Sequence, residues 1–94
     1  MFIFEWNNSK NDLNIKKHGI SFSEARTVFF DEQAILFDDP EHSKEEERFL
    51  LIGMSEKTRV CIVCHCYRKS ETVIRIISAR KATKKEVQRY VEGI

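Results

Sequence analysis

Three runs rich in β-branched and aromatic residues restrict the folds open to this chain more than any other feature. They span residues 47–54, 59–67 and 73–79, and only four or five residues separate each run from the next. Connections this short join antiparallel strands, because parallel neighbours need a crossover of a dozen residues or more. The runs therefore predict an antiparallel meander. A shorter run at 34–37 adds a fourth strand, which the polar segment 38–46 connects to the others.

Helix signals precede and follow these strands. Residues 9–18 form a first predicted helix, which Gly19 ends by allowing a left-handed backbone. Ser21 fits a capping box with Glu24 that starts a second helix, and apolar residues recur at helical spacing to about residue 30. Another box begins at Thr83 and starts a last helix near residue 84. The prediction is an α+β fold with a four-stranded antiparallel sheet, two N-terminal helices and one C-terminal helix.

The length of 94 residues restricts the chain to a single domain, residues 1–94. No uninterrupted apolar run, that of residues 49–52 included, is long enough to cross a bilayer, and the N-terminus lacks the basic start and long apolar region of a signal peptide. Three cysteines within six positions are the wrong number for a disulfide framework and fit a reducing compartment. We therefore expect a cytoplasmic protein with no membrane partner.

Charge is distributed unevenly along the chain. Residues 31–47 contain eight acidic residues and one lysine, whereas residues 57–94 contain ten lysines or arginines and three acidic residues. A basic half suits a polyanion such as nucleic acid, and an acidic loop suits a basic partner, although most such runs are solvated faces. Charge alone therefore leaves nucleic-acid binding open.

The segment from Cys61 to Cys66 contains two ligand patterns, one for covalent haem attachment and one for a Cys/His metal cluster. Side chains alternate between the two faces of a strand, so Cys64 and Cys66 share one face while Cys61 and His65 share the other. Four ligands divided between two faces cannot surround one ion. We therefore predict no metal site and no cofactor, with the cysteines as small buried side chains.

The same alternation predicts a cationic row across the sheet. A tight turn at residues 55–58 sets Arg48 opposite His65, and a five-residue loop at 68–72 sets His65 opposite Arg75. The two guanidiniums would then lie roughly 10 Å apart with the imidazole between them. The opposite face would supply the apolar core, formed by Phe49, Leu51, Ile62, Cys64 and Cys66.

Two interpretations of this row remain open. In the first, Arg48 and Arg75 bind a phosphodiester while His65 transfers a proton. RNA cleavage needs a base for the 2′-hydroxyl, a cation for the pentacoordinate phosphorane and an acid for the leaving oxygen. In the second, the row is a cross-strand salt-bridge ladder with Glu47 or Glu71 on a solvated face.

Several strings resemble the BrnT family of bacterial type II toxins over nearly the whole chain. They are Phe4-Glu5-Trp6, Lys17-His18-Gly19-Ile20-Ser21-Phe22 with Glu24-Ala25, the loop from Asp39-Pro40 to His42-Ser43 followed by Glu47-Arg48, His65, and Arg75-Ile76-Ile77-Ser78-Ala79-Arg80-Lys81-Ala82 with Glu86 and Tyr90. The resemblance implies a RelE-like fold and a metal-independent endoribonuclease that halts translation. It also implies neutralisation by a BrnA-like ribbon-helix-helix antitoxin, in a heterotetramer that contacts DNA only through the antitoxin.

The resemblance further implies roles for individual residues of this sequence. Four residues would be catalytic: Arg48, His65, Arg75 and Arg80. Three would bind substrate: Lys81, His18 and Tyr90. By spacing alone, His18 also fits a helix cap and Tyr90 also fits the core. The cysteines at 61, 64 and 66 depart from the aliphatic residues of related sequences, and we expect them to alter packing or redox sensitivity rather than chemistry. Two other functions stay open, a non-catalytic interaction module and an RNA-binding domain without cleavage.

Overall fold

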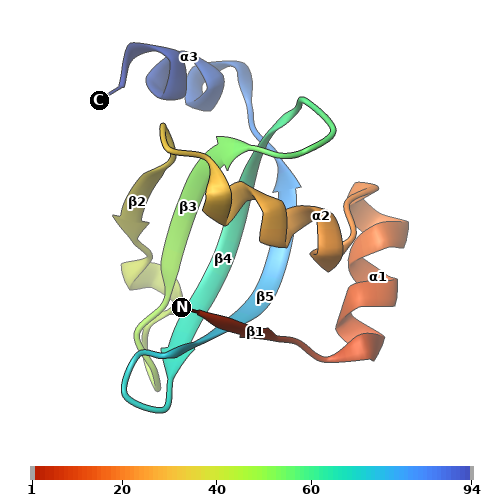
Figure 1. Ribbon diagram of the computed structural model, residues 1–94, viewed down its shortest axis with the longest axis vertical. Coiled ribbons are helices and arrows are strands. Elements are labelled where there is room, and N and C mark those ends of the chain that lie inside the picture. The colour runs from red at the N-terminus through yellow and green to blue at the C-terminus, as the bar shows by residue number, and fades with distance from the viewer. Residues whose placement is uncertain (1, 94) are drawn as a thin grey trace.

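A computed structural model describes residues 2–93 of the chain. Its elements follow the order β1 (Ile3–Glu5), α1 (Asn8–His18), α2 (Phe22–Thr27), the 3-10 turn η1 (Val28–Phe30), β2 (Ile35–Asp38), the 3-10 turn η2 (Pro40–His42), β3 (Phe49–Met54), β4 (Val60–Arg68), β5 (Val73–Lys81) and α3 (Lys84–Glu92). The strands form one five-stranded sheet in the order β1-β5-β4-β3-β2 (Figure 1). The predicted α+β class with three helices is confirmed. Within residues 2–93, none of the helices is long and apolar enough to cross a membrane.

Strand β1 was absent from the predicted sheet. It pairs in parallel with β5, with Ile3 opposite Val73 and Glu5 opposite Arg75. The sheet therefore has five strands and a parallel edge, and the predicted four-stranded, purely antiparallel sheet is wrong. A segment of three residues is too short to show an alternating pattern, and no local signal indicates a partner strand near the other end of the chain.

Strands β2 to β5 form the predicted antiparallel meander, but the β3–β4 register differs by one residue. Phe49, not Arg48, lies opposite His65. The turn causes the shift, because Ser55 pairs with Arg59 through a backbone hydrogen bond of 2.9 Å, while Thr58 takes a left-handed φ of 62°. This is a three-residue hairpin loop instead of the predicted two-residue loop. A shift of one residue moves every side chain to the other face relative to its partner strand.

The β4–β5 register also differs from the prediction. His65 lies opposite Ile76 and Cys66 lies opposite Arg75, whereas Cys64 lies opposite Ser78. A β-bulge between these pairs leaves Ile77 as the extra residue of β5. The bulge turns the consecutive side chains of Ile77 and Ser78 toward the same side of the sheet.

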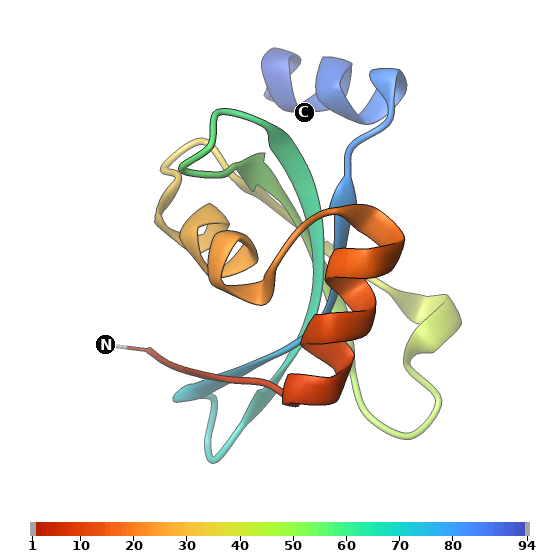
Figure 2. The same ribbon diagram turned by 90° about the vertical axis from the view of Figure 1, so that its right-hand side faces the viewer.

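The two faces of the sheet are covered differently. On one face, which we call the α2 face, helix residues pack on strand residues in a core of Ile20, Phe22, Ala25, Val28, Leu51, Cys61, Val63, Ile76 and Ala79. The other face, the α1 face, carries Leu50, Ile52, Ile62, Cys64 and Cys66 by alternation. Figure 2 shows α2 on one side of the sheet, with α1 and the segment after β2 on the other. The predicted core set was wrong because it mixed residues from both faces.

The predicted helix caps form, with one change. Ser21 accepts a hydrogen bond from the Glu24 amide, as expected. The Glu24 side chain does not complete the box, because it accepts hydrogen bonds from the Ser55 hydroxyl at 2.6 Å and from Arg59 Nε at 2.7 Å. The box at Thr83 is complete. Glu24 therefore ties α2 to the β3–β4 turn instead of closing its own helix.

Gly53 lies where β3 passes beneath η1. A Cβ atom at this position would lie 2.8 Å from Val28 Cγ1 and 3.0 Å from Ala34 Cβ. We expect Gly53→Ala to lower the free energy of unfolding by about 1–3 kcal/mol, because packed neighbours must shift to admit the methyl group. Urea denaturation measures the change. In a Val28→Ala background the added cost of Gly53→Ala should shrink, and an unchanged cost would contradict this contact.

Candidate functional site

The structure separates the predicted row of Arg48, His65 and Arg75. His65 lies on the α2 face with 0% of its surface exposed, and its ring packs edge-on against Phe29 with the ring centres 4.8 Å apart. Burial lowers the pKa of His65, so its imidazole is neutral at pH 7. The predicted placement of His65 in a row with Arg48 and Arg75 is therefore wrong, and its side chain is enclosed in the core.

The cysteines follow the predicted alternation. Cys61 and His65 lie on the α2 face, whereas Cys64 and Cys66 lie on the α1 face, and all three cysteines are buried and unpaired. No group of three or more His, Cys, Asp or Glu residues within residues 2–93 is arranged to hold a metal ion.

Arg48 and Arg75 do share the α1 face, where a salt-bridge ladder connects them. Arg48 lies 3.7 Å from Glu46, and the same carboxylate lies 3.4 Å from Arg68. Arg68 then lies 3.8 Å from Glu5, which binds Arg75 at 2.8 Å. The alternative interpretation of the row predicted a ladder of this kind, but with two other glutamates. Charges are therefore largely matched along this part of the face.

Arg48 is the least engaged arginine of the ladder. Its Nε atom is buried and has no hydrogen-bond partner among the described residues. Its contact with Glu46 is long at 3.7 Å, whereas its backbone is fixed by an amide that donates to Ser43 Oγ at 2.9 Å. Arg48 thus combines a fixed backbone with a guanidinium that is only loosely paired, through a long contact with Glu46.

A histidine outside the predicted set completes the site. The carboxylate of Asp39, 8% exposed, lies 3.0 Å from Nδ1 of His42. Because a carboxylate only accepts hydrogen bonds, Nδ1 carries a proton, and in the neutral ring Nε2 is then the free acceptor. The turn η2 produces this geometry by bringing His42 back over Asp39, and the Ser43 hydroxyl donates to the Asp39 carbonyl at 2.6 Å. The resulting pair resembles the carboxylate–imidazole arrangement that orients a general base.

The sequence holds a signal for this pair that the prediction passed over. Asp39, Pro40 and His42 lie in the segment treated as a polar loop. Proline favours the first position of a helical turn, and a side chain three residues after an aspartate then returns to it. His42 belongs to the loop that resembles the BrnT family, but the sequence prediction assigned it no catalytic or binding role.

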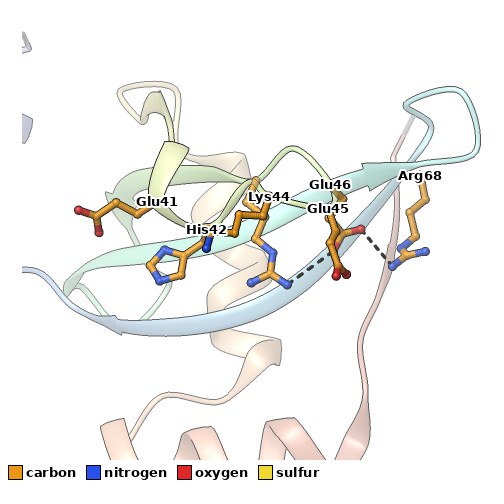
Figure 3. A pocket seen from close by; sticks show the side chains of 7 residues that line it. Glu41, His42, Lys44, Glu45, Glu46 and Arg68 are labelled. Atoms are coloured by element: carbon orange, nitrogen blue, oxygen red, sulfur yellow. Dashed lines mark hydrogen bonds and ion pairs between the residues drawn. The ribbon is translucent and has the colours of Figure 1, made fainter.

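His42 and Arg48 line an open hollow of about 540 Å³ on the α1 face. Its lining residues are Glu41, His42, Lys44, Glu45, Glu46, Arg48 and Arg68. In Figure 3 the carboxylate of Glu41 points away from Glu46 and Arg68, which a dashed line joins. The hollow therefore presents an oriented imidazole together with cationic side chains, and it is open to a large ligand.

Cys64 lies beneath this hollow and supports it. Its thiol donates to Asp39 Oδ2 at 3.8 Å, and burial raises the pKa of Cys64 to about 11. The thiol stays protonated at neutral pH, so it acts as a hydrogen-bond donor to Asp39 and not as a nucleophile.

His18 and Arg80 lie at the other end of the α1 face. They line a small hollow of about 70 Å³ together with Cys64 and Ser78. Arg80 donates to both oxygens of Glu86 at 2.8 and 3.0 Å, which lowers the pKa of Glu86 to about 2. Arg80 is thus held in a bidentate pair, with part of its guanidinium exposed.

Two predicted substrate-binding residues lie elsewhere. Lys81 lies opposite Cys61 and so belongs to the α2 face. The Tyr90 hydroxyl donates to Asp31 Oδ2 at 2.6 Å and thereby anchors α3, which raises the pKa of Tyr90 to about 12. The structure brings neither residue to the hollow around His42. Lys81 faces the other side of the sheet, and the hydrogen bond to Asp31 holds Tyr90 elsewhere.

Comparison with known proteins identifies the family and the fold of the chain. The family model described as "Ribonuclease toxin, BrnT, of type II toxin-antitoxin system" matches residues 6–86. The crystal structure of the Brucella abortus ribonuclease toxin BrnT has a TM-score of 0.67 and 22% identity, covering 89% of this chain and 100% of that one, and so shares the fold. A search of curated proteins gave no match. Because the family model spans most of the chain, the protein belongs to the BrnT family of ribonuclease toxins of type II toxin–antitoxin systems.

Proposed function

We propose that the chain is a metal-independent endoribonuclease whose active site lies on the α1 face around His42 and Arg48. One observation carries the proposal: the imidazole of His42 is held through Nδ1 by the nearly buried Asp39, in the same hollow as the Arg48 guanidinium, whose contact with Glu46 is long at 3.7 Å. This pair supplies a proton acceptor and an anion-stabilising cation. Cleavage of RNA through its own 2′-hydroxyl needs both.

The reaction uses the residues in distinct roles. Nε2 of His42 takes the proton of the 2′-hydroxyl, the 2′-oxygen forms a bond to phosphorus, and the bond from phosphorus to the 5′-oxygen breaks. Arg48 neutralises the charge of the pentacoordinate phosphorane, and Asp39 stabilises the imidazolium that forms. The leaving oxygen takes up a proton from solvent. The products are a 2′,3′-cyclic phosphate and a 5′-hydroxyl end.

The other arginines of the α1 face would extend substrate binding. Arg68 and Arg75 belong to the ladder, and Arg80 keeps part of its guanidinium exposed beside His18. Phosphates of a bound strand would replace the ladder carboxylates as partners of Arg68 and Arg75. In this proposal Arg75 and Arg80 bind phosphate and do not transfer protons.

A second candidate function is a non-catalytic interaction module or RNA-binding domain of the same fold. The ladder favours it, because Glu46 and Glu5 already neutralise much of the charge of the arginines. Two further glutamates line the hollow around His42. A chain of this kind would bind its partner or RNA and leave RNA intact.

We further propose a cellular setting from the family membership. The partner is a BrnA-like ribbon-helix-helix antitoxin, which covers the α1 face with a complementary segment in a heterotetramer. DNA is contacted only through this antitoxin. The free toxin has a RelE-like fold, resides in the cytoplasm and cuts RNA so that translation stops.

Cleavage in the presence of a chelator tests the proposed function. We expect the purified chain to cut a single-stranded RNA in EDTA and to leave a 2′,3′-cyclic phosphate, identified by mass spectrometry of the products. The same RNA with a 2′-deoxyribose at the cleaved position should stay intact, because the nucleophile is gone. Cleavage that EDTA abolishes and Mg²⁺ restores would contradict the metal-independent reaction. RNA that stays intact under every condition would favour the second candidate.

A further inference from the structure

A second hollow lies on the α1 face and differs in charge from the hollow of the proposed active site. Helix α1 and strand β5 enclose about 490 Å³. The lining residues are Lys10, Leu13, Asn14, Lys16, Lys17, His18, Ile77 and Ser78. We call this the α1 hollow. None of these residues is acidic, whereas three glutamates line the hollow around His42.

The lysines of the α1 hollow are free of internal partners. No salt bridge within residues 2–93 involves Lys10, Lys16 or Lys17. This contrasts with the ladder, where every arginine contacts a carboxylate. Three uncompensated ammonium groups around one depression attract an anion more strongly than the matched ladder does.

Local structure gives the α1 hollow an apolar floor as well. Lys10, Leu13 and Lys17 follow one another at helical spacing and therefore share one side of α1. Leu13 is 65% exposed, and the bulge in β5 adds Ile77 beside it. An apolar side chain in this position between lysines leaves a surface that suits the face of a nucleobase.

The α1 hollow is also rigidly built. The side-chain amide of Asn14 donates to the carbonyls of Ile20 and Ala79, each at 2.8 Å, and its oxygen accepts from the Ala79 amide at 3.1 Å. These bonds fix α1 on β5. A ligand therefore meets a preformed surface and does not have to order the helix on binding.

Shared residues connect the α1 hollow with the proposed active site. His18 and Ser78 line both this hollow and the small one that contains Cys64. The Cys64 thiol in turn bonds to Asp39, which holds His42. A strand bound at His42 can thus continue over Cys64 and Ser78 to the lysines of α1.

We propose that the α1 hollow binds the part of the RNA strand that flanks the cleaved linkage. Its phosphates contact Lys10, Lys16 and Lys17, and one base lies against Leu13 and Ile77. The inference rests on the proposed function, because it extends the same substrate along the same face. RNA is favoured over an acidic protein segment because the small hollow that contains Cys64 connects the α1 hollow with the site proposed to bind a phosphodiester.

Salt dependence of RNA binding tests the phosphate contacts. The probe is a fluorescent 12-nucleotide RNA with 2′-O-methyl riboses, which binds but cannot be cut. Each phosphate contact contributes about 0.7 to the slope of log Kd against log salt concentration for a single strand. We expect Lys10→Ala/Lys16→Ala/Lys17→Ala to lower this slope by about 2. The control variant Lys57→Ala/Lys69→Ala/Lys85→Ala removes the same charge outside the hollow and should keep the wild-type slope.

Two further arms separate the possible ligands. Leu13→Ser should weaken binding of the 12-mer but not of polyglutamate of equal charge. Only RNA has a nucleobase that packs against Leu13, so only RNA loses a contact in this variant. In cleavage assays, the ratio of kcat/KM for the 12-mer to that for a dinucleotide should fall at least tenfold in the triple lysine variant. Unchanged slope and ratio, or polyglutamate binding as tight as RNA binding, would overturn the inference. If the wild-type chain leaves a 12-mer RNA with free 2′-hydroxyls intact, the proposed function fails. The salt dependence of binding then still decides whether the α1 hollow binds RNA.

Discussion

Replacing His42 by alanine is expected to lower kcat/KM for RNA cleavage by roughly 10²- to 10⁴-fold, the range for loss of a positioned general base. Nε2 is the free acceptor of this imidazole, because Nδ1 donates to Asp39 at 3.0 Å. The side chain is 60% exposed, so the thermal unfolding temperature should change little. Initial rates on a fluorescent RNA, with unfolding followed by circular dichroism, measure both quantities.

Two matched variants locate the effect. Asp39→Asn keeps the imidazole but removes the carboxylate that orients it and stabilises its protonated form, so activity should fall in this variant as well. His65→Gln removes the buried imidazole and should lower stability while the folded protein keeps its cleavage rate. If His42→Ala cleaves RNA normally and folded His65→Gln does not, the assignment of the active site to the α1 face is contradicted.

Replacing Glu24 by alanine is expected to lower the free energy of unfolding by about 3–5 kcal/mol. Glu24 is 2% exposed, and its carboxylate joins α2 to the β3–β4 turn through Ser55 and Arg59. Its loss leaves the nearly buried Ser55 hydroxyl without this partner and opens a void beneath α2. Urea denaturation measures the change. Glu56→Ala, which removes an exposed carboxylate from the same turn, should stay within about 0.5 kcal/mol of the wild type.

The Glu24 ion pair also predicts a pH dependence. Hydrogen bonds from Arg59 hold the pKa of Glu24 below its usual value of 4.5. A carboxyl group with a lowered native pKa stabilises the fold fully above its unfolded pKa and loses this contribution as pH falls through the native value. The wild type should therefore lose stability more steeply below pH 4.5 than Glu24→Gln, which folds without an ionisable group. Parallel stability curves between pH 7 and pH 3 would contradict the pair.

Local signals in the sequence were sufficient for most of the helices and strands. Gly19 ends α1 with a φ of 70°, and Thr83 caps α3 in a complete box, as their residue types predict. These features depend on neighbours within four residues. The predicted capping role of the Glu24 side chain was wrong because its partners lie more than thirty residues away in the sequence. A rule based on neighbouring residues cannot predict such contacts.

Strand register was the decisive feature that the sequence could not supply. A two-residue and a three-residue loop both fit the segment 55–58, but they place Arg48 on opposite sides relative to His65. The left-handed φ of Thr58 selects the longer loop, and threonine carries no signal for that conformation. The predicted cationic row therefore lost its histidine, while Arg48 and Arg75 kept a common face.

The uneven charge of the sequence is partly neutralised within the fold. Glu46, from the acidic segment 31–47, lies within 4 Å of Arg48 and Arg68 on the α1 face. The sequence predicted a salt-bridge ladder as an alternative to a phosphate site, and in the structure a ladder connects Arg48, Arg68 and Arg75. The proposed active site uses groups outside the ladder's strong pairs, namely His42 and the Arg48 guanidinium, whose contact with Glu46 is long at 3.7 Å.

The position of bound RNA tests the central claim most directly. Backbone ¹H–¹⁵N chemical shifts of the labelled chain can be followed while a 2′-O-methyl RNA is added. Our account predicts the largest shift changes at His42, Ser43, Arg48 and Arg68, with little change along α2. Shift changes that cluster on α2 and leave His42 and Arg48 unaffected would contradict an active site on the α1 face.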